Sequence, residues 1–113
     1  DVDNQVVGAV HCGWRGVVAG VVPATVEAMV RSGAQPSSIS AIVGPAICPS
    51  CYAVDPDCGA AVAEVSPASA TRVFAEQIQE CTFTNRELFS YRRSRVTGRQ
   101  GAVIVMREVG ARA

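Results

Sequence analysis

Short runs of β-branched and other apolar residues without a helical period indicate where the chain should form strands. These runs are residues 5–11, 39–44, 73–81 and 102–109. The first run reads QVVGAVH, so His11 is expected at the carboxyl end of a buried strand. The second run leads into residues 44–52, where prolines and cysteines forbid regular structure over most of the length.

Between the first two runs the apolar spacing becomes helical. Apolar residues recur on one helical face from Val18 to Val30, and this helix is expected to stop at Gly33. Pro23 has no backbone N–H to donate, which disturbs a helix anywhere beyond its first turn. The helix is therefore expected either to kink at Pro23 or to begin near Val22.

A second helix is expected from Pro56 to Val65, because Asp55 is a good N-cap and proline is favoured at the first helical position. Residues 85–89 are expected to form one helical turn, and residues 97–99 a turn between extended segments. Strands and helices thus alternate, which is typical of a mixed α/β domain. No repeat or linker divides the chain.

Composition indicates a buried core, because 49% of the 113 residues are apolar. Ten basic and ten acidic residues cancel, which gives no reason to expect a nucleic-acid or membrane partner. All ten basic residues are arginine, and five of them lie in residues 86–99 beside a single acid, Glu87, so an anion site is plausible there. Without a long apolar run or a secretory signal, and with five cysteines, the expectation is a cytoplasmic protein with reduced thiols.

The first segment that could carry chemistry is HCGWRG, residues 11–16. His11 would follow a strand and precede two glycines that let the backbone approach a ligand closely, with Arg15 four residues later. The alternative is a strand-to-helix turn in which Trp14 fills the core. Spacing alone does not separate these interpretations.

Cys48 and Cys51 form a CxxC pair, a spacing typical of zinc knuckles and of thiol redox pairs. A four-ligand zinc site lacks its second pair, because Cys58 and Cys81 stand alone in the sequence. A redox pair would open a helix, and Pro49 leaves no room for one. Unpaired, partly buried thiols are therefore the expectation.

A third segment contains FSYRR, residues 89–93, and TGR, residues 97–99. Arg92 and Arg93 offer planar forks suited to phosphate or carboxylate, and Tyr91 could stack on a base. The alternative is a solvated turn in which the arginines pair with surface acids.

Three motifs, taken in order, resemble one family over nearly all of the chain. They are HCGWRG at residues 11–16, GPAICPSCYAV at 44–54 and CTFTNRELFSYRRSRVTGR at 81–99. This is the bacterial laccase-domain or YfiH-type family, once labelled multicopper polyphenol oxidoreductases and now described as zinc-dependent purine nucleoside phosphorylases. Family members are about twice this long, so the resemblance implies that residues 1–113 are the C-terminal part of a single laccase-type domain.

The chain departs from the family pattern at two places. Cys12 stands where the family usually has alanine. The family also carries an additional helix between the positions of Ala70 and Cys81, whereas this chain runs almost directly into the next strand. We therefore expect a missing segment near residues 70–75.

The family's metal site uses two histidines and a cysteine, and the resemblance implies that His11 is one of the histidine ligands. The other two ligands belong to upstream segments that this sequence does not contain, so the upstream half of the same protein is an expected partner. The resemblance gives Cys48 and Cys51 no place among the ligands.

The resemblance implies a zinc-dependent purine nucleoside phosphorylase that cleaves inosine or adenosine with phosphate, with adenosine deamination as a side activity. His11 and Arg15 are then the expected catalytic residues, and Arg92 and Arg93 the expected substrate-binding residues, the arginine roles resting on donor geometry. The implied fold is α/β (mixed α+β), a layered α/β/β/α arrangement that is incomplete in this chain.

Two other functions remain open. A copper-dependent, laccase-like polyphenol oxidoreductase is the older family label, and copper favours imidazole and thiolate ligands. A non-enzymatic alternative is that the chain, lacking two metal ligands, is an inactive fragment or scaffold domain.

Overall fold

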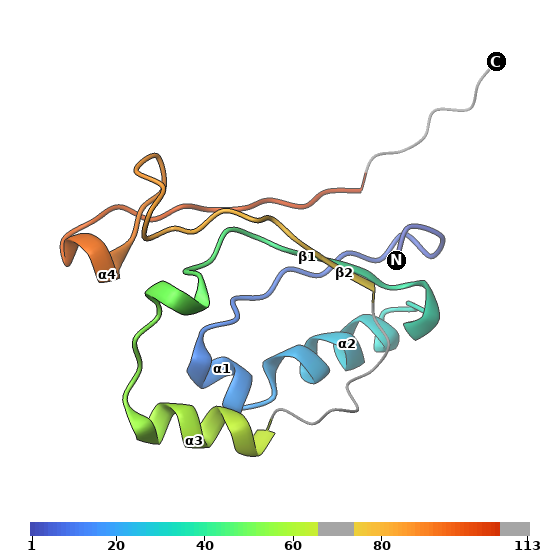
Figure 1. The fold of residues 1–113 in the computed structure, drawn as a ribbon. Helices are drawn as coiled ribbons and strands as arrows, with labels where there is room; N and C mark the ends of the chain where they lie inside the picture. Colours follow the sequence, from blue (N-terminus) through green and yellow to red (C-terminus); the bar gives the residue numbers. More distant parts are fainter. Residues whose placement is uncertain (66–73, 107–113) are drawn as a thin grey trace.

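The computed structural model describes residues 1–65 and 74–106 (Figure 1). Their helices and strands form a small mixed fold, in which α1, α2 and α3 lie on one side of a two-stranded sheet (Figure 1). In chain order the elements are α1 (Trp14–Val18), α2 (Val21–Arg31), β1 (Ser40–Val43), α3 (Pro56–Val65), β2 (Phe74–Gln77) and α4 (Tyr91–Ser94). Two short 3-10 turns, Pro36–Ser38 and Pro49–Cys51, flank β1. The predicted mixture of helices and strands is confirmed.

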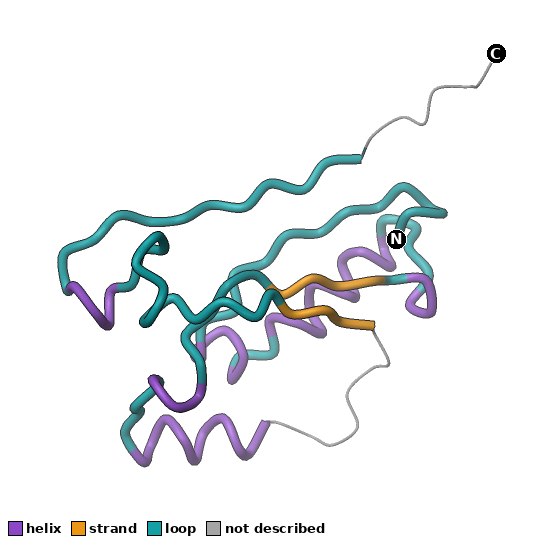
Figure 2. Tube along the Cα trace, turned by 45° about the horizontal axis from the view of Figure 1, so that its top comes forward, coloured by secondary structure: helices purple, strands orange, loops and turns teal. Residues whose placement is uncertain are grey.

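The two strands pair in parallel, with Ser40 opposite Phe74 and Val43 opposite Gln77. Pairing continues past the strand ends, because the Ile78 N–H donates to the Val43 carbonyl over 3.0 Å. Further along, an isolated parallel bridge joins Ala46 to Cys81. The strands expected within 39–44 and 73–81 are thus confirmed in their described parts, and the segments that follow them run side by side (Figure 2).

The helix expected from Val18 onward is divided in two. Gly20 adopts a left-handed conformation with φ of 73°, which separates α1 from α2. Because α2 begins at Val21, Pro23 falls in its first turn, where a missing N–H costs no helical hydrogen bond. The alternative in which the helix begins near Val22 is therefore the better prediction.

The end of α2 follows from its glycine. Gly33 has φ of 104° and donates its N–H to the Val30 carbonyl over 2.9 Å. Ala34 then donates to the Met29 carbonyl over 3.0 Å. These two bonds satisfy the last carbonyls of a helix that ends in a Schellman motif. The predicted stop at Gly33 is confirmed, and Ala34 is buried directly after it.

The predicted boundaries of α3 are confirmed at Pro56 and Val65. Asp55 caps the helix, since its Oδ1 accepts a hydrogen bond from the Cys58 N–H over 2.8 Å. Cys58 is buried on this helix, and α3 packs against α1.

Two predicted strands are wrong within the described residues. Residues 5–11 and 102–106 have neither helix nor strand there. A strand needs a neighbour to receive its backbone hydrogen bonds, and the described chain offers these segments none. The rest of the second prediction, residues 107–109, lies outside the described residues, as does most of the expected gap near 70–75, which stays a prediction.

The two short elements predicted near the third motif are also displaced. Residues 85–89 form turns, and the helical turn comes instead at α4. The chain bends at Arg95, whose φ is 49°, before it reaches residues 97–99, which have no regular structure.

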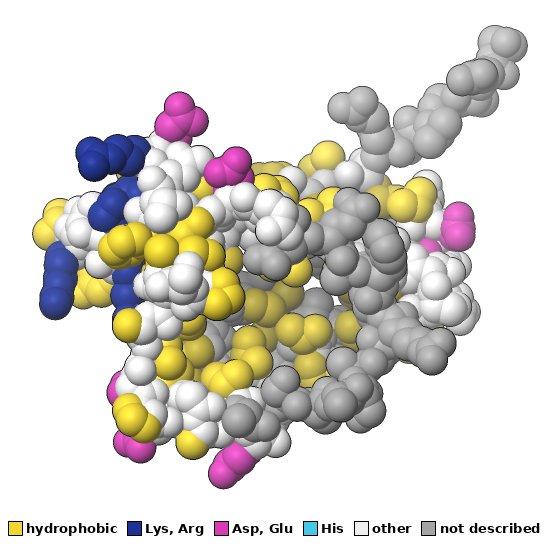
Figure 3. Space-filling model, in the orientation of Figure 1, with side chains coloured by type: hydrophobic (Ala, Val, Ile, Leu, Met, Phe, Trp, Pro, Cys, Tyr) yellow, Lys and Arg dark blue, Asp and Glu magenta, His cyan; other side chains and the backbone are white. Residues whose placement is uncertain are grey.

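The core of the described residues is small. Its buried apolar side chains are Ala34, Ile39 and Cys58. Larger apolar side chains stay exposed, with Ile42 at 73% and Val103 at 90% of their surface, and Figure 3 shows apolar atoms across the hollow between the strands and α3. No helix in the described part of the chain has the length and apolar character that crossing a membrane requires.

Candidate functional site

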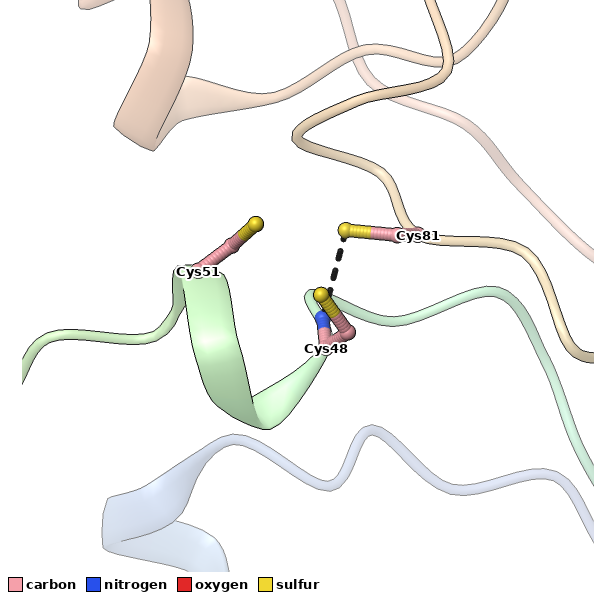
Figure 4. A group of neighbouring side chains, drawn as sticks. All are labelled: Cys48, Cys51 and Cys81. Carbon is pink, nitrogen blue, oxygen red and sulfur yellow. Dashed lines mark hydrogen bonds between the residues drawn. The ribbon is translucent and has the colours of Figure 1, made fainter.

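Three cysteines meet beyond the carboxyl ends of β1 and β2. Cys48 precedes the 3-10 turn Pro49–Cys51, Cys51 ends it, and Cys81 follows β2 in the bridge to Ala46. Their Sγ atoms all lie within 4.8 Å of one another, and Figure 4 shows the sulfurs directed toward a shared space. Thiolates are strong ligands for soft metal ions, so these residues could hold one.

Local backbone structure explains why the CxxC pair converges. Residues three apart lie on the same side of a 3-10 turn, which has three residues per turn. The turn is closed by the Cys51 N–H, which donates to the Cys48 carbonyl over 3.0 Å. Parallel pairing of the following segments adds Cys81, because the Thr82 N–H donates to the Ala46 carbonyl over 3.1 Å.

The three thiols have unequal electrostatic surroundings. The Cys48 backbone N–H donates to the Cys81 Sγ over 3.3 Å and is the main reason that the pKa of Cys81 falls to about 6, against partial desolvation. The hydrogen bond with the Cys48 thiol, followed by desolvation, raises the pKa of Cys51 to about 11. At neutral pH the metal-free cluster therefore contains a thiolate at Cys81 beside a thiol at Cys51.

Sequence spacing does not reveal this cluster, because Cys81 stands alone in the sequence. All five cysteines are free in the structure, and Cys58 is buried apart from the others. The signal that could have revealed the cluster is that one predicted strand is followed by Cys48 and another ends at Cys81. If those strands pair in parallel, their carboxyl ends and the cysteines meet at one edge.

His11 lies in the irregular segment before α1, with its side chain exposed. Its Nε2 would stand 3.2 Å from a Cβ placed on Gly13, so a side chain at that position would crowd the imidazole. Among the described residues, the three cysteines are the group arranged to hold a metal ion, and His11 is not one of its members. The ligand role of His11 stays a prediction.

The predicted anion-binding arginines differ in how they are held. Arg15 is exposed, with its guanidinium carbon 5.1 Å from the Trp14 ring centroid. Arg92 lies 5.0 Å from the Tyr52 ring centroid and donates from Nη1 to the Ala53 carbonyl. These contacts orient both guanidinium groups by stacking, which is a favourable arrangement for cations on aromatic rings.

Arg93 holds the loop after Cys81 together through hydrogen bonds to its carbonyls. Its Nη1 donates to the carbonyls of Thr82, Phe83 and Asn85 over 3.0, 3.1 and 2.8 Å. Its Nη2 donates to the Leu88 carbonyl over 2.6 Å. In the described chain Arg92 and Arg93 thus bond to carbonyls, whereas the alternative predicted from the sequence is pairing with surface acids. Figure 3 shows basic side chains gathered at the end of the molecule where α4 lies.

Comparison with known proteins identifies relatives over most of the chain. The sequence model of a family described as multi-copper polyphenol oxidoreductase laccase matches residues 1–80 and 71–107. The purine nucleoside phosphorylase SCO2081 of Streptomyces coelicolor is 40% identical over 119 aligned positions, covering 85% of this chain and 49% of the relative. The purine nucleoside phosphorylase YfiH of Escherichia coli is 34% identical, covering 87% of this chain and 50% of the relative.

A third relative has a different name. The adenosine deaminase RL5, from an unknown prokaryotic organism, is 46% identical over 55 residues, covering 47% of this chain and 21% of the relative. No solved structure matches. The chain spans about half the length of the phosphorylases that it matches. Because the family match extends over most of its length, the chain belongs to the multi-copper polyphenol oxidoreductase laccase family, whose YfiH-type members it resembled by its three motifs.

Proposed function

We propose that the chain is part of a zinc-dependent purine nucleoside phosphorylase that cleaves inosine or adenosine with phosphate. The observation that carries this proposal is the 40% identity, over 85% of the chain, with a relative named purine nucleoside phosphorylase. A side activity as adenosine deaminase is supported by the name of the shorter-matching relative.

In phosphorolysis a phosphate oxygen forms a bond to the anomeric carbon of the ribose while the bond from that carbon to the purine nitrogen breaks. The purine leaves with the bonding electrons and takes up a proton. Positive charge develops on the sugar, so the enzyme must above all position the phosphate anion.

Arg15 and Arg92 are proposed to make these anion contacts. Arg15 is exposed, and Arg92 commits a hydrogen bond to the Ala53 carbonyl while most of its N–H groups remain for a ligand. Arg93, the other proposed substrate-binding residue, retains its Nε–H and one N–H of Nη2 for a substrate, since Nη1 donates to three carbonyls and Nη2 to one.

His11 is proposed as one zinc ligand. An exposed imidazole beside Gly13 fits this role, but within the described residues it belongs to no group of three or more ligating side chains. The remaining ligands, and the layers that would complete an α/β/β/α arrangement, are proposed to come from the upstream half of the same protein. When bound with three protein ligands, zinc supplies an open position that lowers the pKa of bound water, which suits deamination.

The test uses the complete protein with inosine and inorganic phosphate, and chromatography for hypoxanthine and ribose 1-phosphate. We expect both products, and we expect His11→Ala to lose zinc while Cys12→Ser, its neighbour, retains it. If neither product forms while zinc is bound, the phosphorylase proposal is wrong. If zinc content is unchanged in His11→Ala, the ligand assignment is wrong.

The anion contacts are tested separately. Because a charged hydrogen bond contributes about 1.5–3 kcal/mol, Arg92→Gln should raise the KM for phosphate by roughly ten- to a hundredfold. Arg99→Gln is the matched control, since Arg99 is an exposed arginine in the same segment, and it should leave the KM unchanged. An unchanged KM in Arg92→Gln would remove Arg92 from the substrate site.

A copper-dependent polyphenol oxidoreductase is the second candidate. It is favoured by the description of the family and by the three thiols, since thiolate ligands select copper among other soft metals. Stoichiometric copper in the purified protein, with oxygen consumption on addition of a phenol, would support it over the phosphorylase.

A further inference from the structure

We propose that Cys48, Cys51 and Cys81 form a three-thiolate site for a closed-shell thiophilic metal ion, Zn²⁺ or Cu⁺, separate from the site of His11. This proposal does not rest on the proposed phosphorylase activity. It assigns a function to three residues that the metal site implied by the family resemblance leaves unused.

Distances between the sulfur atoms fit such an ion. Zinc–sulfur bonds of about 2.3 Å place two sulfurs of one coordination sphere roughly 4 Å apart. The Sγ atoms of the three cysteines lie within 4.8 Å of one another, so small rotations of side chains that already converge would complete the sphere (Figure 4).

Hydrogen bonds fix the backbone segments that carry the three thiols. The Cys48 N–H donates to the Cys81 Sγ, as backbone amides commonly do to metal-bound thiolates, and the Ala46–Cys81 bridge fixes the two segments. Arg92 anchors the Ala53 carbonyl two residues after Cys51. Arg93 anchors the Thr82 carbonyl directly after Cys81 over 3.0 Å. Preorganised ligands lose less entropy when a metal ion binds.

The two anchoring arginines also suit the charge of the site. Three thiolates with Zn²⁺ carry a net charge of −1, and with Cu⁺ a net charge of −2. Arg92 places a cation on the carbonyl two residues after Cys51, and Arg93 places one on the carbonyl directly after Cys81. The negative charge of Glu80, the residue before Cys81, has the opposite effect on an anionic site. Its Oε2 accepts a hydrogen bond from the Asn85 Nδ2 over 2.8 Å.

A pocket of about 160 Å³ adjoins two of the three cysteines. It is lined by Cys48 and Cys81 together with Ala46, Pro49 and residues 78–80. Its size admits a water molecule or a small thiol as an additional ligand. Structural zinc sites are closed by four protein ligands, whereas sites that exchange a ligand keep one position open. The cluster therefore has the form of an exchanging site.

The test is carried out on the complete protein in the His11→Ala background, which removes the proposed zinc ligand. Reduced, metal-stripped protein is titrated with Co²⁺ as a spectroscopic probe of thiolate ligation, and then with Zn²⁺ and, without oxygen, with Cu⁺. We expect one equivalent of Co²⁺ to produce an intense sulfur-to-cobalt charge-transfer band. Displacement of the band by Zn²⁺ or by Cu⁺ then identifies the ion that the site prefers.

Cysteine variants in the same background locate the site. Cys51→Ser and Cys81→Ser should each lose the band and weaken metal binding by at least tenfold, with circular dichroism unchanged. Cys12→Ser is the matched control, because Cys12 is exposed and is not a member of the cluster, and it should keep the band.

Two results would overturn the proposal. The first is a band that survives in both Cys51→Ser and Cys81→Ser. The second is a reduced protein that binds no metal and, on exposure to air, becomes lighter by two hydrogens through a disulfide within the cluster. Neither result bears on phosphorolysis, which is measured in protein that retains His11, so the two proposals can fail independently.

Discussion

At the scale of single residues, two arginines that look equivalent in the sequence make different contacts in the structure. Arg92 and Arg93 are adjacent, yet the first stacks on Tyr52 and the second bonds to four carbonyls of one loop. A guanidinium can serve several carbonyls at once because its N–H groups fan out in a plane. An ammonium has three donors on one atom and cannot span the same acceptors.

We predict that Arg93→Lys destabilises the protein by about 1–3 kcal/mol, because several charged hydrogen bonds to partly buried carbonyls are lost. The free energy of unfolding from denaturant titration measures the effect. Arg99→Lys, on an exposed position, should change it by less than about 0.5 kcal/mol. Equal stability of the two variants would show that the carbonyl contacts contribute nothing.

The unequal thiols predict a pH dependence of alkylation in reduced, metal-stripped protein. A thiolate is the reacting species, and the lowered pKa of Cys81 means that its thiolate is present above pH about 6 and is lost as the pH falls through that value. Cys51, whose pKa is raised to about 11, should stay slow throughout the neutral range. Peptide mass spectrometry after iodoacetamide treatment gives both rates.

The control for this measurement is the same protein unfolded in denaturant, in which both thiols should titrate together near the ordinary value of about 8.5. A folded protein in which Cys81 and Cys51 share one midpoint would contradict the prediction.

At the scale of elements, glycines mark where the helices end or weaken. Gly33 takes φ of 104° to close the Schellman motif of α2, a conformation that side chains disfavour. Gly59 lies within α3, where an added Cβ would meet no atom within 4 Å. The same substitution should therefore have opposite effects at the two positions.

We predict that Gly33→Ala destabilises the protein by about 1–2 kcal/mol and that Gly59→Ala stabilises it by about 0.5–1 kcal/mol. The reasons are backbone strain at the first position and a smaller loss of backbone entropy at the second. Thermal unfolding of both variants under one set of conditions checks the signs. A stabilising shift in Gly33→Ala would show that the left-handed conformation of Gly33 is not needed, and a destabilising shift in Gly59→Ala would contradict the entropy argument for α3.

Helix boundaries with strong local signals could be predicted from the sequence, whereas strand-like composition was right for β1 and β2 and wrong for two other runs. The boundaries of α3 and the end of α2 depend on a cap residue, a proline and a glycine that lie within a few positions. Residues 5–11 and 102–106 have strand-like composition, but strand formation depends on a partner that periodicity cannot supply.

The same limit applies to the candidate site. The motif around His11 and the arginines could be found by residue type, because their chemistry is visible in the sequence. The thiol cluster depends on the parallel pairing of β1 with β2. This pairing brings Cys81 close to Cys48 and Cys51, which lie 30 or more positions earlier in the chain. That pairing is a tertiary property, and it has no local signal.

At the scale of the whole molecule, the fold is less compact than is usual for a domain of this length. Its radius of gyration is 16.6 Å, whereas about 13 Å is typical of a compact domain of this length. Apolar side chains remain exposed on both strand and irregular segments, including Ile42 at 73% and Val105 at 71%. Exposed apolar surface of this kind is usually covered by another part of a protein or by a partner.

We predict that the 113 residues, when expressed alone, associate with themselves. Burial of the exposed apolar faces is the driving force, so the mean mass in sedimentation velocity should rise with concentration. Adding apolar-to-polar changes at exposed positions, Ile42→Thr with Val103→Thr, should reduce the association. A monomer at every concentration tested would show that the exposed faces do not interact.

The position of Arg93 also sets an order of events during protein synthesis. Translation proceeds from the amino terminus, so Cys48, Cys51 and Cys81 are all synthesised before Arg93 is added. Because Arg93 donates to carbonyls of the loop after Cys81, that loop gains its side-chain anchor only when the following segment has been made and has folded back. The anchored form of the thiol cluster therefore arises late in biosynthesis, after the chain up to Arg93 has left the ribosome.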